Sequence, residues 1–149
     1  MSELPKEVNH ELTMLPYYGV FDYLGFKVEG RDVTLVGQVR WPTLKTRAEN
    51  AVRGIHGVET VTDNIEVLPL SPNDDRLRLA IYRAIYSQPS LQRYQLAAVP
   101  PIHILVKNGD VTLVGNVVSK VDKALAGAQT NAVAGVHKVT NDITVEGAP

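Results

Sequence analysis

The sequence predicts an α+β protein built from two tandem α-β-β-α-β units, each a small mixed three-stranded sheet with two helices packed on one face. Three observations lead to this prediction. The segment Asp-Val-Thr-Leu-Val-Gly at 32–37 recurs unchanged at 110–115. The same shift of 78 residues aligns nine further identities without a gap, from Val39 with Val117 to Val67 with Val145. Within both copies, strand-like alternation and helix-like spacing of apolar residues follow in the same order.

A helix and then a hairpin are expected at the start of each copy. In the first copy Pro16 ends this helix early, whereas in the second Asn73-Asp74-Asp75 supplies N-terminal caps for a helix over 74–86. The hairpin of the second copy turns at Asn108-Gly109, two residue types that accept positive φ. The hairpin of the first copy is expected to turn at Glu29-Gly30.

A second helix and a last strand complete each copy. Pro42 lies in the first helical turn, where its missing N–H costs nothing, and Ser119 with Asp122 forms a start like a capping box. Gly57 and Gly135 are expected to end these helices as C′ residues. The strand that follows should return to the same sheet, parallel to one hairpin strand.

The pattern of the second copy resembles the BON domain, named for bacterial OsmY and nodulation proteins. It reads Asn-Gly-Asp-Val-Thr-Leu-Val-Gly-Asn-Val over 108–117 and Gly-Val-His-Lys-Val-Thr-Asn-Asp-Ile over 135–143. The first copy matches over its hairpin, second helix and last strand, and has an atypical, aromatic-rich front end. The resemblance implies domains over 1–68 and 74–149, joined by a short proline-containing linker over 69–73.

The resemblance implies a non-enzymatic binding module of the bacterial envelope. BON proteins are typically periplasmic or tethered to the outer membrane, and are associated with phospholipid binding, osmotic stress and adaptor or chaperone-like roles. The expected partners are therefore an anionic phospholipid surface or envelope proteins, and we expect a monomer whose domains dock. No basic or apolar leader is visible at 1–5, so a cytoplasmic location is the alternative. Two other functions stay open: a protein-only periplasmic adaptor or holdase, and a cytoplasmic ion-responsive sensor.

Composition excludes several classes of protein. The 149 residues carry 15 Lys and Arg against 16 Asp and Glu, a balance that argues against nucleic-acid binding. The absence of cysteine excludes disulfides, thiolate nucleophiles and cysteine-ligated metals. No apolar run approaches the ~20 residues that a membrane-spanning helix needs.

No catalytic site, metal site or cofactor is expected. The sequence lacks a nucleophile elbow, a phosphate loop and a dinucleotide fingerprint. Its histidines, which show no ligand spacing, are His10, His56, His103 and His137.

The helix over 74–86 carries the first candidate binding site. One face is apolar and belongs to the core, but the opposite face also carries large side chains. These candidate lipid- or partner-binding residues are Arg76, Leu79, Tyr82, Arg83 and Tyr86. Aromatic rings flanked by cations suit a phospholipid headgroup region. Alternatively, this face packs against the first copy or beneath the loop over 87–101.

The segment 15–26 carries the second candidate, because five of the nine aromatic residues lie in it. Its proposed surface residues are Tyr17, Tyr18 and Tyr23, which would contact a peptide, a ligand or a membrane. Alternatively, the rings complete the core where the first helix is cut short, with Phe21 and Phe26 inside. Trp41 is expected to cover the core at a helix start.

Overall fold

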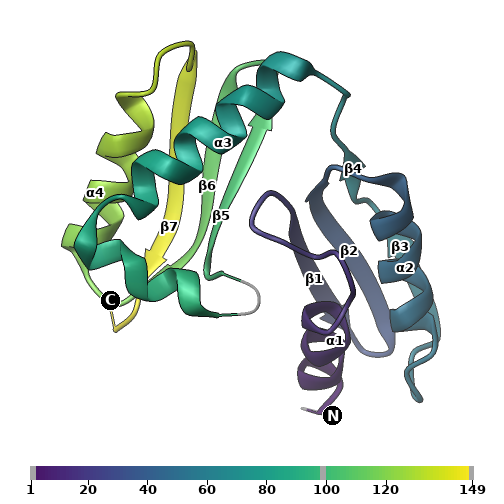
Figure 1. The fold of residues 1–149 in the computed structure, drawn as a ribbon. Helices are drawn as coiled ribbons and strands as arrows, with labels where there is room; N and C mark the ends of the chain where they lie inside the picture. Colours follow the sequence, from purple (N-terminus) through teal and green to yellow (C-terminus); the bar gives the residue numbers. More distant parts are fainter. Residues whose placement is uncertain (1–2, 98–99, 148–149) are drawn as a thin grey trace. The chain divides into compact units, whose positions relative to one another are not determined.

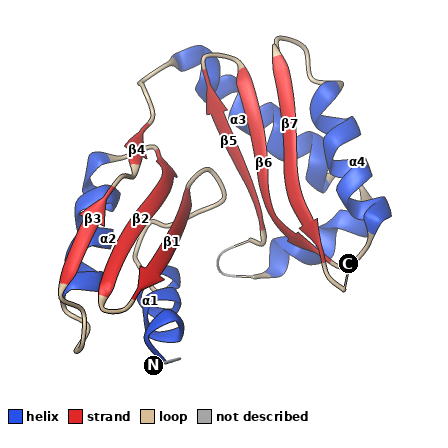
Figure 2. Ribbon diagram, turned by 180° about the vertical axis from the view of Figure 1, so that it is seen from behind, coloured by secondary structure: helices blue, strands red, loops and turns tan. Residues whose placement is uncertain are grey.

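The computed structural model describes residues 3–97 and 100–147, which form two compact units (Figure 1). The first unit consists of Met1–Tyr18 and Asp22–Leu68, and the second of Gly19–Phe21 and Pro69–Pro149. Residues 1–2 and 148–149, at the outer ends of the two expected domains, lie outside the described residues. Both units have the predicted α+β architecture, with helices covering one face of a mixed sheet (Figure 2).

The sheet of the first unit has β2 at its centre. Its elements are, in chain order, α1 (Glu3–Thr13), β1 (Tyr23–Glu29), β2 (Asp32–Val39), α2 (Pro42–Arg53), β3 (Thr60–Asp63) and β4 (Glu66–Val67). β1 runs antiparallel to β2, and β3 and β4 both run parallel to it. Asp32 lies opposite Thr60 and Gln38 opposite Glu66, so β3 and β4 are one strand in a constant register, interrupted between them.

The second unit repeats this topology and adds one element. Its elements are α3 (Pro72–Tyr86), the 3-10 helix η1 (Pro89–Leu96), β5 (Ile102–Lys107), β6 (Asp110–Val117), α4 (Lys120–Asn131) and β7 (Lys138–Val145). β6 is antiparallel to β5 and parallel to β7. β6 and α4 both follow β2 and α2 by the 78 residues of the repeat. The sequence did not predict η1, which lies between the first helix and the hairpin.

Some of the predicted turns and helix ends agree with the structure, and others do not. Asn108 and Gly109 take φ values of 52° and 85°, which confirms the predicted hairpin turn. The first hairpin turns at Gly30-Arg31 rather than at Glu29-Gly30, because Glu29 still pairs with Asp32. Gly57 and Gly135 are not C′ residues. α2 and α4 have already ended at Arg53 and Asn131, and these glycines shape the turn into the last strand.

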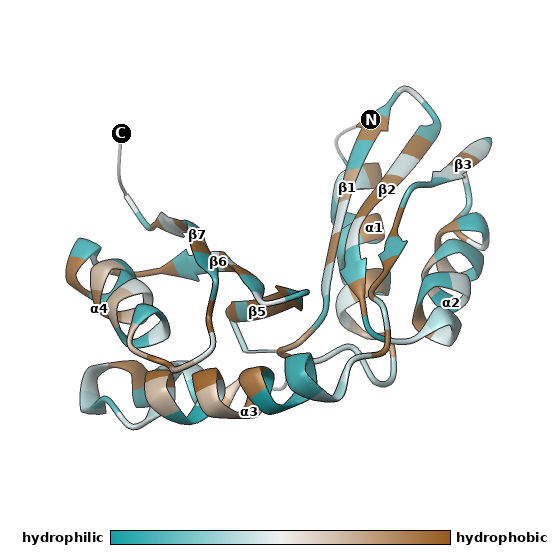
Figure 3. Ribbon diagram, turned by 90° about the horizontal axis from the view of Figure 1, so that it is seen from above, coloured by the Kyte–Doolittle hydropathy of each residue, from teal (hydrophilic) through white to brown (hydrophobic). Residues whose placement is uncertain are grey.

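Each unit has its own apolar core between helices and sheet. In the second unit the core includes Leu77 and Ile81 of α3 and Leu113 of β6, all fully buried. Polar and apolar residues alternate along α3 (Figure 3), and its buried residues include the charged Asp74 and Arg78 as well as apolar ones. In the first unit Leu35 of β2 and Leu44 of α2 are buried in the same way, with no more than 1% exposure. The apolar faces predicted for these helices are therefore confirmed.

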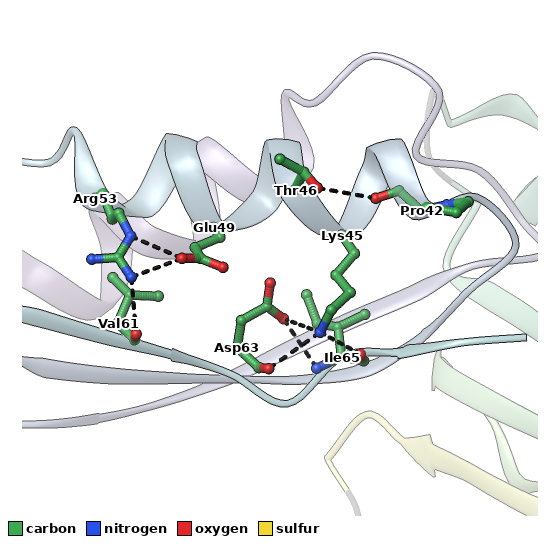
Figure 4. A network of polar contacts seen from close by, with 8 residues as sticks. All are labelled: Pro42, Lys45, Thr46, Glu49, Arg53, Val61, Asp63 and Ile65. Carbon is green, nitrogen blue, oxygen red and sulfur yellow. Dashed lines mark hydrogen bonds and ion pairs between the residues drawn. The ribbon is translucent and has the colours of Figure 1, made fainter.

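α2 is joined to the last strand of the first unit by polar contacts (Figure 4). The Lys45 ammonium donates to the carboxylate of Asp63 at 3.0 Å and to the carbonyl of Ile65 at 2.8 Å. The same carboxylate accepts the Ile65 N–H at 3.1 Å. Asp63 thus satisfies the backbone where the strand is interrupted, and Lys45 ties that point to the helix.

Candidate binding sites

The start of α3 is fixed by a side chain that reaches the hairpin. Ser71 is the N-cap: its hydroxyl accepts the N–H of Asp74 at 3.1 Å, so the prediction that Asn73-Asp74-Asp75 caps this helix is wrong. The Asp74 carboxylate, 1% exposed, instead accepts the N–H groups of Asn108 and Gly109 at 2.8 and 3.0 Å. A tight turn leaves these donors free, and a buried carboxylate is a strong acceptor for them.

Arg78 makes a second link between α3 and the hairpin. It is only 3% exposed, and its guanidinium donates to the carbonyl of Val106 at 2.8 Å and to the carboxylate of Asp75 at 2.6 Å. Asp74 and Arg78 therefore both act inside the unit. Neither charge is available to a partner, which separates them from the remaining arginines of this helix.

The predicted binding face of α3 divides into an exposed part and a covered part. Arg76, Leu79 and Arg83 are exposed, with Leu79 at 50%. Their spacing of three and four residues places them on one stripe along the helix. We call these three residues the α3 stripe.

The two tyrosines of the predicted face lie in the covered part. Tyr82 is half-buried: its hydroxyl accepts from the Gln95 amide at 2.9 Å, and its ring centroid lies 6.2 Å from that of Phe21. Tyr86 is 5% exposed, its ring lies 4.8 Å from Tyr82, and burial raises the pKa of its hydroxyl. Tyr86 is therefore not a surface residue, because η1 and residues 19–21 lie over this side of the helix.

Residues 19–21 also supply a hydrogen-bond acceptor to the outer edge of β5. The N–H of Ile104 donates to the carbonyl of Val20 at 2.8 Å, and Val20 and Phe21 pack on the core of the second unit. Phe21 is half-buried here rather than inside the first copy, where the aromatic segment was expected to place it. Sequence periodicity within one helix could not have found this partner.

The stripe is electrostatically unbalanced. Arg76 donates to the neutral Asn73 side chain at 3.2 Å, and Arg83 has no carboxylate partner among the described residues. The second unit has eight Lys and Arg against six Asp and Glu, a net charge of +2, whereas the first has seven against ten, a net charge of −3. Asp74 and Asp122 are 1% and 2% exposed, which leaves cations in excess on the surface of the second unit.

A polar cluster covers the start of α4. Ser119 caps the helix by accepting the N–H of Asp122 at 3.1 Å, which is the serine half of the predicted capping box. The Asp122 carboxylate accepts from the hydroxyl of Tyr94 at 2.6 Å and from Arg93, and the Tyr94 oxygen accepts the N–H of Val118 at 3.0 Å. Burial acts to raise the pKa of Asp122, but the hydrogen bonds from Tyr94 and Arg93 outweigh it and lower that pKa.

The tyrosines of the second candidate surface differ in exposure. Tyr17 is 79% exposed, in the left-handed region at φ 69°, and Tyr23 is half-buried. Tyr18 is 9% exposed, and its oxygen accepts the N–H of Leu24 at 3.1 Å. Burial raises its pKa to about 12. Tyr18 therefore completes the fold, and only Tyr17 stands fully at the surface.

Two further aromatic residues depart from expectation. Phe26 is half-buried rather than inside, since its strand lies at the edge of the sheet. Trp41 was expected to cover the core but is 46% exposed. The Arg40 guanidinium lies 5.7 Å from its ring centroid. Trp41 is the N-cap of α2, so its expected place at a helix start is confirmed.

The glycines of the repeated motif have structural roles. Gly115 takes φ 148°, and a Cβ atom there would collide with the carbonyl of Pro101.

Within residues 3–97 and 100–147, no group of three or more His, Asp or Glu side chains could hold a metal ion. None of the helices described there is long and apolar enough to cross a membrane.

Comparison with known proteins identifies the family. The C-terminal domain of CdsD, a structural protein of the type III secretion system of Chlamydia trachomatis, is 15% identical, with a TM-score of 0.35 over 100% of this chain and 99% of that one. A second structure of CdsD is 16% identical, with a TM-score of 0.34 over 96% and 92%. No curated protein matches the chain. The family model of the BON domain matches residues 13–69 and 73–147, and the chain therefore belongs to the BON-domain family, with two copies in tandem.

Proposed function

We propose that the protein is an envelope module whose second unit binds anionic phospholipid surfaces through the α3 stripe. Membership of the BON-domain family fits a non-enzymatic binding module. The observation that carries the proposal is the stripe itself, in which an exposed leucine lies between two arginines that no described carboxylate neutralises. A cation near an anionic leaflet contributes about 1 kcal/mol, and an apolar side chain can enter the interface beside it.

The expected association is weak and sensitive to salt. Two arginines contribute roughly 2 kcal/mol together, which corresponds to roughly a 30-fold preference for anionic over zwitterionic surfaces. Because exposed charges are screened over about 8 Å at physiological ionic strength, this preference should fall as salt is added. The covered tyrosines do not contribute, and their role in the proposal is to hold α3 in place.

Vesicle sedimentation tests the proposal. The protein should pellet with phosphatidylcholine vesicles that contain one quarter phosphatidylglycerol, and remain in the supernatant with phosphatidylcholine alone. The combined variant Arg76→Gln, Leu79→Ser and Arg83→Gln should abolish pelleting. Its matched control removes two exposed cations and one exposed apolar residue from the first unit: Lys27→Gln, Arg31→Gln and Val36→Ser. Equal pelleting on both vesicles, or unchanged pelleting of the stripe variant, contradicts the proposal.

The proposal also places the protein in the periplasm or at the outer membrane. In cells of the native host, osmotic shock should release it or membrane fractionation should retain it with the outer membrane. Recovery only with cytoplasmic markers contradicts this part of the proposal and favours the ion-sensor alternative. A shift of thermal stability with K⁺ but not Na⁺ would then support that alternative.

A further inference from the structure

A cavity of about 230 Å³ lies at the start of α2 in the first unit. Its lining residues are Pro16, Tyr17, Trp41, Thr43, Leu44 and Arg47. Leu44 is 1% exposed, whereas Tyr17 and Trp41 are 79% and 46% exposed. The lining is thus mainly apolar and includes two aromatic side chains that face solvent. We call it the α2 cavity.

Each polar side chain that lines the α2 cavity can donate a hydrogen bond, and those of Trp41 and Arg47 can only donate. The Tyr17 hydroxyl and the Trp41 indole N–H make no hydrogen bond to the described part of the chain, and neither does the Arg47 guanidinium. Arg47 is the one charged residue among those lining the cavity, and Arg40 lies against the Trp41 ring. Trp41 caps α2 without a side-chain hydrogen bond. A complementary ligand is therefore apolar, rich in acceptors, and anionic beside Arg47.

The second unit shows that the fold does not require this opening. The shift of 78 residues places Ser119 at the position of Trp41, and Asp122 at that of Leu44. There Ser119 caps the helix, and the Asp122 carboxylate is bonded by Tyr94 and Arg93 of η1. The same helix start is therefore filled by the chain's own side chains in one unit and left open between exposed aromatic residues in the other.

We propose that the α2 cavity binds an extended proline-containing segment of a partner protein that carries an acidic residue next to its prolines. A polyproline helix offers apolar rings and unbonded carbonyl oxygens, and proline has no backbone N–H. It therefore presents acceptors to the Tyr17 and Trp41 donors while its rings pack between theirs, as in other aromatic-lined grooves that bind such segments. The acidic residue pairs with Arg47. Binding of lipid to the α3 stripe is a separate property of the other unit.

Trp41 is the one tryptophan of the chain, so its fluorescence reports on the α2 cavity directly. The probe is a synthetic peptide of six prolines followed by two glutamates, titrated into the full-length protein. The expected result is a saturable blue shift of Trp41 emission. A control peptide in which glycine and serine alternate in place of the prolines should leave the emission unchanged, and so should phosphatidylglycerol vesicles without peptide.

Two variants assign the binding to the α2 cavity. Tyr17→Gly removes a wall from a position whose φ of 69° glycine accepts, so the fold is kept. Arg47→Gln removes the charge. Each should weaken binding at least about fivefold, as truncation of an aromatic or arginine hot spot does. Arg31→Gln, an exposed arginine away from the cavity, is the matched control and should bind as the wild type does.

Three outcomes would overturn the proposal. These are no change of Trp41 emission with the proline peptide, an equal change with the glycine-serine peptide, and an equal change with vesicles alone. The third outcome would assign the aromatic pair to a membrane surface instead. Loss of vesicle pelleting in the α3 stripe variant with unchanged peptide binding would show that the two proposals stand or fall independently.

Discussion

The turn before the second helix differs between the two units, although the repeat aligns it without a gap. In the second unit η1 brings Tyr94 and Arg93 onto Asp122, and Tyr94 also accepts the N–H of Val118. Among the described residues of the first unit there is no such helix, and the matching N–H of Arg40 donates to the buried carboxylate of Asp22 at 2.8 Å. The same backbone N–H group therefore has a different side-chain acceptor in each unit. The second unit closes its helix start with polar side chains, and the first leaves a cavity beside it.

The hairpins show the same contrast. Asp74 closes the turn of the second hairpin from α3, and Arg78 holds the adjacent strand. In the first unit the equivalent turn at Gly30-Arg31 lies beside exposed pairs such as Arg31 with Glu59, at 3.8 Å. Exposed ion pairs contribute little stability, whereas buried charge-assisted hydrogen bonds contribute more. Duplication thus preserved the backbone while the side-chain links between elements diverged.

The largest effect is expected from Asp74→Ala, which breaks the link between α3 and the hairpin. Loss of the carboxylate leaves the N–H groups of Asn108 and Gly109 without their acceptor, at a cost of about 3 kcal/mol in the free energy of unfolding. Chemical denaturation measures this loss, and both amides should exchange faster with deuterium. Asp142→Ala, at an exposed position, is the control. Unchanged exchange at both amides would contradict the assignment.

A somewhat smaller effect is expected from Tyr94→Phe in the polar cluster of the second unit. The hydroxyl donates to Asp122 and accepts from Val118, so its removal costs about 2 kcal/mol while the ring stays in place. Denaturation by urea measures the loss. Tyr17→Phe removes an exposed hydroxyl and should cost nothing. Equal effects of the two substitutions would remove the distinction between the closed and the open helix start.

The same cluster should make the protein sensitive to acid. The pKa of Asp122 in the folded chain lies below its usual 3.8, so its contribution to stability is present above pH 3.8 and is lost as pH falls through the lowered pKa. Asp122→Asn should therefore reduce stability at neutral pH and flatten its decline in acid. Urea denaturation at several pH values tests this. A decline as steep as in the wild type would show that other carboxylates are responsible.

The smallest effect is expected from Tyr17→Gly at the open helix start. A tyrosine at φ 69° is strained by about 1 kcal/mol, and glycine relieves this strain but loses more backbone entropy on folding. The net change in the free energy of unfolding should lie within about 1 kcal/mol of zero. Thermal denaturation measures it. A loss clearly above that value would mean that the exposed ring belongs to the core rather than to a binding surface.

Local sequence patterns account for most of the fold. The repeat, the Asn108-Gly109 turn and the apolar faces of α2 and α3 depend on residues close in sequence, and the structure confirms them. The sequence predicts the ends of the helices less accurately. Gly57 and Gly135 were assigned to C′ positions because glycine is common there, but their positive φ serves the following turn instead.

The candidate surfaces were predicted only in part, because exposure depends on distant segments. Arg76, Leu79 and Arg83 are exposed as the pattern indicates, yet Tyr86 on the same predicted face is buried. Helical periodicity gives the direction of a side chain but not what packs against it. Trp41 and Arg47 were missed as a pair with Tyr17, since they come together only when α2 packs beside the end of α1.

By itself the sequence determined that two α-β-β-α-β copies follow one another, because strand alternation, turn residues and a 78-residue repeat are local or periodic features. Only the tertiary structure decided which charges are used inside the fold and which remain at the surface. The donors to Asp74 lie 34 and 35 residues further along the sequence, and Tyr94 lies 28 residues before Asp122. Contacts at such separations depend on how helices pack on the sheet, and no local pattern encodes them.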